Sequence, residues 1–309
     1  MVSTRLTVAQ FLSIVELRTK IISVATFVAG TLYAVLQTDV FSPWVTLLMF
    51  LAVLFVDMAT TAFNNFFDYL RGTDVADYNV EENKVLLHQG VAPGWALVIA
   101  LICYILAAVL GVAIAYLRGW WIIPVGAVCM LVGYFYTGGP RPIATTPFGE
   151  LFAGGFLGMV LFLLSAAVQT PPGSDLLTAW VVVGGLPPFF TIAAILAVNN
   201  SCDREGDGAA GRRTFAVLVG ERVSRVYVYL LAALAHVALV VLVIFDKLPV
   251  PAAVPIVLSA VFAAVQFRKM DRRGYTFETK GPNMVAILKV YLVQSAMYVA
   301  SLVSGLFLR

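Results

Sequence analysis

The stretch NNSCDREGD, from Asn199 to Asp207, directly follows a long apolar run. A helix of about 20 apolar residues crosses a bilayer, so the stretch begins where such a helix would meet water. In a helix, Asn199, Asp203 and Asp207 recur every four residues and would project from one face. Carboxylates at a membrane boundary are costly unless something offsets their charge, and Mg²⁺ suits such hard oxygen ligands. The stretch therefore predicts a cation site at the end of a membrane helix.

A second copy stands earlier in the chain, as NNFFDYLRGTD from Asn64 to Asp74, and it also closes a long apolar run. Both copies begin NNxxD, so Asn64 and Asp68 repeat the offset of Asn199 and Asp203. Asp74 would point away on an unbroken helix, but a glycine before it is expected to end the helix and let a loop bring Asp74 back. The two copies suggest an internal duplication that frames one site between two halves.

Composition places the chain among integral membrane proteins. Of its 309 residues, 61% are hydrophobic and 12% are charged, and the mean hydropathy is +0.93. Soluble domains do not have this composition. The formal charge of +3 is too small to indicate a nucleic-acid partner, and three cysteines without CxxC spacing do not form a disulfide framework.

Nine apolar runs are long enough for transmembrane helices. They cover 20–37, 44–66, 95–117, 120–137, 150–169, 178–200, 224–245, 249–267 and 284–307. The run at 120–137 gives the weakest signal, because Pro124 and Gly126 interrupt it. A short interfacial helix is expected within 5–17. We therefore predict an all-α polytopic bundle of about nine transmembrane helices, as a single domain over 1–309 with two pseudo-repeated halves.

The distribution of basic residues predicts the orientation. Lysines and arginines crowd the loops on one side of these spans, whereas the other side holds only Arg118, Lys247 and Arg309. Basic loops stay in the cytoplasm. The N-terminus is therefore predicted inside and the C-terminus outside, and both Asp-rich stretches then face the cytoplasm.

The four aspartates of the two copies would repel one another at short range unless cations lie among them. These are Asp68, Asp74, Asp203 and Asp207. Two Mg²⁺ ions would balance their charge. Lys84, Arg212 and Arg213 follow the copies, and their placement suits diphosphate oxygens. Metal and basic groups around a diphosphate can ionise a C–O bond. The alternative for either copy alone is a solvated loop with ordinary salt bridges.

The two copies resemble the aspartate-rich motifs of the UbiA superfamily of intramembrane prenyltransferases, and the resemblance covers nearly the whole chain. NNSCDREGDGAAGRRT, the following LVGER, and YTGGPRPIATTPFGEL from Tyr136 to Leu151 are most similar to the branch that prenylates 1,4-dihydroxy-2-naphthoate in menaquinone synthesis. At Lys84 relatives often have Arg-Pro, so this position keeps the charge but loses the forked guanidinium.

The resemblance implies a mechanism. A polyprenyl diphosphate is bound through Mg²⁺ held by the four aspartates, with Asn64 and Asn199 as ligands or supporting donors. The diphosphate leaves, and the electron-rich ring attacks the allylic cation. In the naphthoate branch the ring carbon that bears the carboxyl group is alkylated, and the carboxyl group is lost as CO₂. The resemblance further implies a bacterial or archaeal cell membrane and contact with lipid, and the small formal charge already argues for no nucleic-acid partner.

Several candidate residues have two interpretations each. Asp57 lies seven residues before Asn64 on the same helix face. It either polarises a phenol or takes a proton, or it is a neutral, hydrogen-bonded core group. Tyr134 and Tyr136 either stabilise a prenyl cation or belong to an interfacial aromatic belt. Arg141 either meets a substrate anion or is only a positive-inside residue.

Two other functions compete with this one. A secondary transporter also combines internal repeats with polar residues at broken helices, but its site usually lies near the midplane rather than at one face. Within the superfamily, 4-hydroxybenzoate or another acceptor can replace dihydroxynaphthoate. The roles of His88 and Lys289 stay open.

Overall fold

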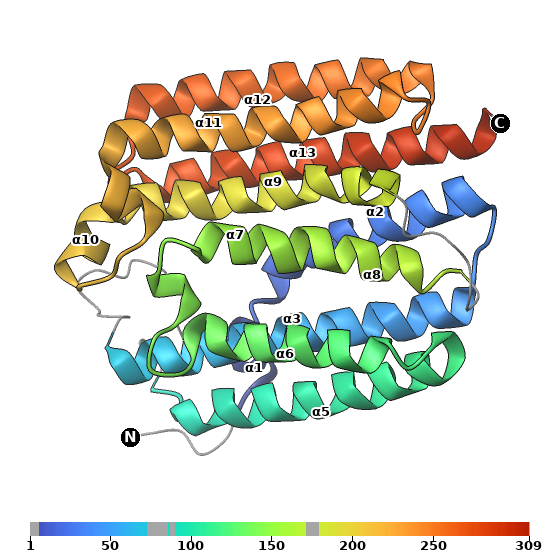
Figure 1. The fold of residues 1–309 in the computed structure, drawn as a ribbon. Coiled ribbons are helices and arrows are strands. Elements are labelled where there is room, and N and C mark those ends of the chain that lie inside the picture. Colours follow the sequence, from blue (N-terminus) through green and yellow to red (C-terminus); the bar gives the residue numbers. More distant parts are fainter. Residues whose placement is uncertain (1–5, 73–85, 87–89, 171–178, 309) are drawn as a thin grey trace. The chain divides into compact units, whose positions relative to one another are not determined.

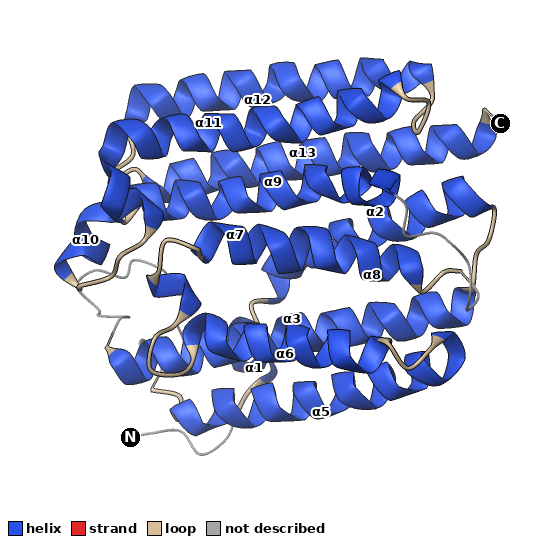
Figure 2. Ribbon diagram, in the orientation of Figure 1, coloured by secondary structure: helices blue, strands red, loops and turns tan. Residues whose placement is uncertain are grey.

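The protein is described by a computed structural model that covers residues 6–72, 86, 90–170 and 179–308. Every regular element in this part of the chain is a helix (Figures 1 and 2). Eight helical segments within it are long and apolar enough to cross a membrane, and one shorter apolar helix matches the weakest predicted span. The eight are Leu17–Thr38, Pro43–Arg71, Pro93–Arg118, Gly149–Ala167, Ala179–Cys202, Phe215–Ile244, Val250–Arg273 and Lys280–Phe307, and the shorter one is Ile122–Thr137. The predicted all-α membrane bundle is confirmed.

The chain forms two compact units, which share the long helices α2 (Ile21–Thr38) and α3 (Pro43–Arg71). The first unit comprises Met1–Val24 and Leu47–Ala144, and the second comprises Ala25–Thr46 and Thr145–Arg309. The single domain and the duplication of two halves stay predictions.

The first unit holds the earlier Asp-rich copy at the end of α3. Its other elements are α1 (Val8–Ile14), η1 (Leu17–Lys20), α5 (Pro93–Arg118), α6 (Ile122–Thr137) and the start of η2 (Ile143–Thr145). α1 is the expected N-terminal helix, with Thr7 as its side-chain cap. α5 and α6 lie side by side, and a buried cluster around Ile14, Phe63 and Cys103 joins α1, α3 and α5. The earlier Asp-rich copy therefore lies on a helix that packs against an apolar core.

The second unit holds the later copy, at the end of a buried helix. Its elements are α7 (Gly149–Ala153), the π-helix η3 (Gly154–Val160), α8 (Leu161–Ala167), α9 (Ala179–Cys202), α10 (Arg204–Ala209), α11 (Phe215–Ile244), η4 (Val250–Ala252), α12 (Ala253–Arg273) and α13 (Lys280–Phe307). α11, α12 and α13 lie side by side (Figure 1), and α9 packs against both α11 and α13. α9 is therefore the central helix of this unit.

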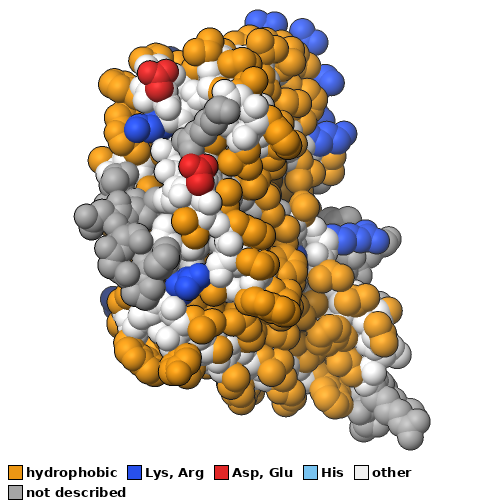
Figure 3. All heavy atoms as spheres, turned by 90° about the vertical axis from the view of Figure 1, so that its right-hand side faces the viewer, with side chains coloured by type: hydrophobic (Ala, Val, Ile, Leu, Met, Phe, Trp, Pro, Cys, Tyr) orange, Lys and Arg blue, Asp and Glu red, His pale blue; other side chains and the backbone are white. Residues whose placement is uncertain are grey.

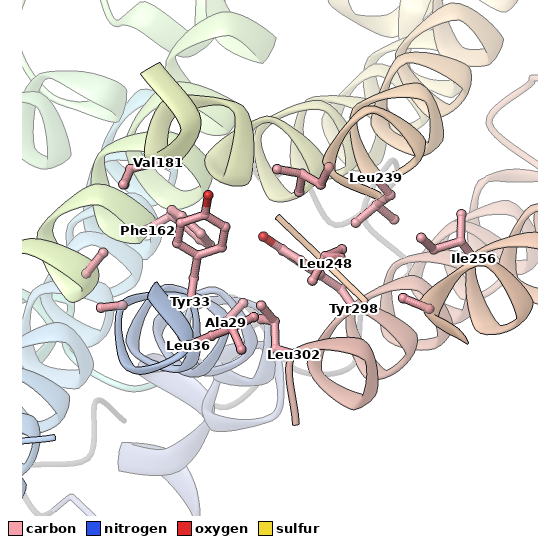
Figure 4. Close-up of a cluster of buried hydrophobic side chains, with 14 residues drawn as sticks. Ala29, Tyr33, Leu36, Phe162, Val181, Leu239, Leu248, Ile256, Tyr298 and Leu302 are labelled. Carbon is pink, nitrogen blue, oxygen red and sulfur yellow. The ribbon is translucent and has the colours of Figure 1, made fainter. Parts of the chain in front are cut away.

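The core of the second unit combines aliphatic and aromatic side chains (Figure 4). The Tyr33 and Phe162 rings lie 5.6 Å apart, and the Phe162 and Tyr298 rings stack at 6.4 Å. Both tyrosine hydroxyls find carbonyl acceptors, Tyr33 at Trp180 (2.9 Å) and Tyr298 at Gly184 (3.0 Å). Buried hydroxyls without acceptors would destabilise the fold, so these bonds let tyrosine serve as a core residue.

The outer surfaces of the spanning helices are apolar. Large hydrophobic side chains such as Ile105 on α5 and Val254 on α12 are each 63% exposed. Figure 3 looks toward the helix ends that lie at the right of Figure 1, and hydrophobic side chains are exposed there too. Soluble monomers rarely expose continuous apolar surface on this scale. The surface therefore matches helices that face lipid.

Glycines on η3 allow the fifth span to approach α9 closely. A Cβ on Gly158 would lie 2.5 Å from the Cα of Phe189, and one on Gly154 would lie 2.4 Å from the Phe189 carbonyl oxygen. Small residues at such crossings are typical of membrane helices, because packing rather than water exclusion drives their association.

We expect Gly158→Ala to destabilise the protein by about 1–3 kcal/mol, because overpacking forces two helix backbones apart. Unfolding of the purified protein in detergent measures the change. Gly155→Ala is the matched control, since a Cβ there meets nothing within 4 Å and alanine favours a helix. Equal stability of the two variants would contradict the close packing.

Candidate active site

The later Asp-rich copy lies where α9 passes into α10. α9 ends at Cys202, and Asp203 separates it from α10. The backbone N–H groups of Asp203 and Asp207 still donate to the carbonyls of Asn199 (3.0 Å) and Asp203 (2.8 Å). The four-residue repeat therefore continues through the junction. The Asn199 Nδ2 donates to Asp203 Oδ2 at 3.2 Å, so the structure brings these two side chains together.

Each carboxylate of this copy contacts a basic side chain. The Nζ of Lys280, the first residue of α13, lies 2.8 Å from Asp203 Oδ2. The Nη1 of Arg212 lies 3.1 Å from Asp207 Oδ1. Burial raises the pKa of Asp207, and the neighbouring Asp203 raises it further, whereas Arg212 and Lys280 oppose the shift. Two acids and two bases thus form one charge cluster in the second unit.

Arg213 takes a different position from Arg212. Its side chain is exposed, and its backbone N–H donates to the carbonyl of Thr145 at 2.9 Å. The segment after the acidic cluster is thereby joined to the chain just before α7.

The earlier copy occupies the last turns of α3. Asn64 and Asp68 are both half-buried there. The helix ends at Arg71, and Gly72 follows with φ of 62°, as predicted for a glycine that ends this helix. Asp74, Lys84 and His88 lie outside the described residues.

Asp57 belongs to a buried ion pair in the first unit. Lys20 Nζ lies 2.7 Å from Asp57 Oδ1 and 2.6 Å from Thr61 Oγ1, and Ser23 Oγ donates to Asp57 Oδ2 at 2.6 Å. Lys20 is only 3% exposed. The Lys20 ammonium group is thus turned inward to Asp57. This geometry fits the core interpretation of Asp57, with an ionic partner in place of a neutral one.

The aromatic candidates lie at the end of α6. The Tyr134 ring packs edge-on against Phe63 (5.4 Å) and Phe67 (5.5 Å), next to the first copy. Tyr136 is half-buried and Arg141 is exposed. The sequence alone did not reveal that Arg71 would reach this end.

Arg71 joins the end of α3 to the loop that carries Arg141. Its guanidinium donates to the carbonyls of Thr137 and Gly139, and it lies 5.4 Å from the centre of the Phe67 ring. Basic groups at a helix C-terminus stabilise its last carbonyls. Arg71 therefore fixes where this loop begins.

The donor set of the second copy fits Mg²⁺. Among the described residues, no three His, Cys, Asp or Glu side chains form a group that would hold a metal alone. Mg²⁺ does not need one, since it is usually held by one or two carboxylates together with substrate phosphates. Asp203 and Asp207 supply two carboxylates, of which Asp203 contacts the Asn199 amide, and both already contact cationic groups. Oxygen donors of this kind suit magnesium rather than a soft metal.

Comparisons with known proteins agree on one family. The UbiA prenyltransferase family profile matches residues 23–280. A Bacillus subtilis (strain 168) protein named 1,4-dihydroxy-2-naphthoate octaprenyltransferase is 36% identical over 249 residues, which are 79% of this chain and 76% of that protein. A Mycobacterium tuberculosis protein of the same name is 31% identical over 76% of this chain and 78% of its own length. The solved structure of a UbiA homologue from Archaeoglobus fulgidus bound to DMAPP and Mg²⁺ has a TM-score of 0.70 at 16% identity, covering 96% of this chain and 98% of that one.

Proposed function

The chain belongs to the UbiA prenyltransferase family, and we propose that it transfers a polyprenyl group from a polyprenyl diphosphate to 1,4-dihydroxy-2-naphthoate with loss of CO₂. The choice of acceptor rests on the 36% identity to the Bacillus subtilis protein named 1,4-dihydroxy-2-naphthoate octaprenyltransferase. Membership of an enzyme family also favours catalysis over transport. The proposed reaction is a step of menaquinone biosynthesis, and its product would stay in the membrane.

The two Asp-rich copies are the proposed metal site, with Asp68, Asp74, Asp203 and Asp207 as ligands. Asn64 and Asn199 would support them. Two Mg²⁺ ions would balance these four carboxylates. When bound, Mg²⁺ neutralises charge on the departing diphosphate. The cluster around Asp203 supports this assignment, as does the Mg²⁺ bound to the Archaeoglobus fulgidus homologue.

The basic residues near the acidic copies are also proposed to bind the diphosphate. Lys280 neutralises Asp203, and Arg212 neutralises Asp207. A metal bound to the two aspartates would take the place of these basic side chains, which would then be available to contact diphosphate oxygens. Arg212 offers a forked donor for such oxygens, whereas Lys280 offers a point charge. Lys84, Arg141 and Arg213 are further proposed contacts of the substrate anion.

The carbon chemistry needs a site that stabilises positive charge and excludes water. Tyr134 and Tyr136 are proposed to face the allylic cation, since an aromatic ring attracts positive charge at its face. The packing of Tyr134 beside Phe67 supports this role. Asp57 is the weaker candidate for substrate contact, because its carboxylate contacts Lys20 and Ser23. The site is proposed to open toward the cytoplasm.

Acceptor competition tests the proposed activity. The purified protein in lipid nanodiscs is given one labelled polyprenyl diphosphate with equal amounts of dihydroxynaphthoate and 4-hydroxybenzoate. We expect a prenylated naphthalene product and one CO₂ for each prenyl group transferred. Prenylation of hydroxybenzoate alone would overturn the acceptor, and no product with any acceptor would overturn the proposed enzyme activity.

Metal removal tests the proposed cofactor separately. We expect EDTA to abolish product formation and added Mg²⁺ to restore it, because four acidic side chains and a diphosphate would otherwise repel one another. Recovery of diphosphate release and of prenyl transfer should follow the same Mg²⁺ titration. Full activity in EDTA would contradict a metal-dependent site.

A further inference from the structure

The two asparagines of each NNxxD copy point to different surroundings. The first of each pair, Asn64 and Asn199, is half-buried, and Asn199 contacts an acidic side chain. The second of each pair is buried, with Asn65 at 5% and Asn200 at 4% exposure. A primary amide has two donors and one acceptor, so a buried one needs partners. The second asparagine therefore faces protein in both copies.

Each second asparagine donates to an earlier segment of its own unit. Asn200 Nδ2 donates to Glu150 Oε1, in the first turn of α7, at 2.9 Å. Asn65 Nδ2 donates to the carbonyl of Ile14, at the end of α1, at 2.9 Å. The copies thus share an anchoring bond although their acceptors differ, a side chain in one and a backbone carbonyl in the other.

Glu150 is an unusual acceptor. It is 1% exposed, and among the described residues its other oxygen, Oε2, has no hydrogen-bond partner. A buried carboxyl group with one oxygen unpaired is costly. Its side-chain bond goes to the residue between Asn199 and Ser201, within the acidic copy itself.

The segment that ends in the first turn of α7 contacts the chain on both sides of the acids of the later copy. Asn200 precedes Asp203, and Arg213, whose backbone donates to Thr145, follows Asp207. A segment of six residues, 145–150, thereby fixes the chain before and after the charge cluster. Side chains that ligate a metal need such outer partners to hold them in register.

We propose that the second asparagine of each copy is a positioning residue, Asn200 through Glu150 and Asn65 through the carbonyl of Ile14. These residues hold the adjacent acidic side chains in place without touching the metal or the substrate. The inference rests on the proposed Mg²⁺ and prenyl diphosphate binding. Breaking the bond leaves every proposed ligand present, but binding must then order a looser segment, which weakens it.

Four variants test the bond between Asn200 and Glu150. They are Glu150→Leu, Asn200→Leu, the double variant and Glu150→Gln. The probe is geranyl S-thiolodiphosphate, a prenyl diphosphate whose bridging oxygen is sulfur, and calorimetry records its binding as Mg²⁺ is titrated. We expect either leucine variant to raise the Mg²⁺ concentration for half-maximal binding by about 10–100-fold. The double variant should lose no more than either single one, because both remove the same bond.

Glu150→Gln distinguishes the hydrogen bond from the charge. Its amide oxygen still accepts from Asn200, so binding should stay near that of the wild type. Ser259→Ala is the control for stability, since it removes a buried contact between Ser259 Oγ and His236 Nε2 (3.2 Å) elsewhere in the second unit. It should lower stability but leave the Mg²⁺ titration unchanged.

The outcomes separate this inference from the proposed function. If wild-type protein binds the analogue only with Mg²⁺, but both leucine variants bind it equally well, the positioning role is overturned. A loss in Glu150→Gln as large as in Glu150→Leu also overturns it, in favour of a required charge. If the wild-type protein shows no Mg²⁺-dependent binding, the proposed function itself fails. Should Glu150→Leu not fold, Asn200→Leu tests the same bond from its donor side.

Discussion

Asp203→Asn is expected to slow prenyl transfer by about 100- to 1000-fold, the loss that corresponds to a few kcal/mol of metal-assisted stabilisation of the leaving group. Asparagine keeps the shape of the side chain and removes its negative charge. Asp203 is the acid that contacts both Asn199 and Lys280, so its charge lies at the centre of the cluster. Asp68→Asn should give a comparable loss, since Asp68 holds the same place in the earlier copy.

The measurement is turnover at saturating Mg²⁺ by protein that has been checked for membrane insertion. Asp271→Asn is the matched control, because Asp271 is also an ion-paired carboxylate of the second unit, 3.4 Å from Arg225 but 48% exposed. That variant should keep normal turnover. Near-normal turnover by Asp203→Asn would remove the main support for the proposed metal site.

The second large effect concerns stability. Lys20→Met is expected to destabilise the protein by about 3–5 kcal/mol, because it leaves the Asp57 carboxylate buried without its partner. Asp57→Leu should be equally severe for the converse reason. The double variant Lys20→Met, Asp57→Leu should recover most of the lost stability, since a well-packed apolar pair can replace a buried ion pair at little cost. Unfolding in detergent measures all three.

Arg225→Met provides the comparison for an exposed ion pair. Its bond to Asp271 is solvated, so its loss should change stability by less than about 1 kcal/mol. If Lys20→Met loses no more stability than Arg225→Met, the ion pair between Lys20 and Asp57 does not stabilise the fold to the extent proposed. If the double variant is as unstable as the single ones, packing rather than charge explains the loss.

Sequence patterns predicted the helices well because membrane spans are defined locally. A run of apolar residues must form a helix in lipid, since no water is present to satisfy its backbone. The weakest predicted span, 120–137, corresponds to α6 even though Pro124 lies near its start, where a helix has no backbone bond to lose. The four-residue spacing from Asn199 to Asp203 likewise predicted a contact that depends only on helical geometry.

The partners of the charged residues were not predictable in this way. Lys20 meets Asp57 across 37 positions, Glu150 meets Asn200 across 50, and Lys280 meets Asp203 across 77. Such contacts depend on how helices pack, which no local period encodes. Counting the basic residues on each side of the membrane also treats every lysine alike. It could therefore not distinguish the buried Lys20 from an exposed lysine. The useful signal was Asp57 itself, because an acid inside a span implies a nearby cation.

The π-helical turn Gly154–Val160 determines where the fifth span can change its length. Such turns accommodate one residue more than an α-helix of the same rise, so they can be regarded as insertions. Deleting one residue between Gly154 and Val160 would therefore restore an ordinary α-helix and leave Glu150 directed at Asn200. The same deletion in the regular helix α8 would instead rotate everything before it by about 100° relative to everything after it.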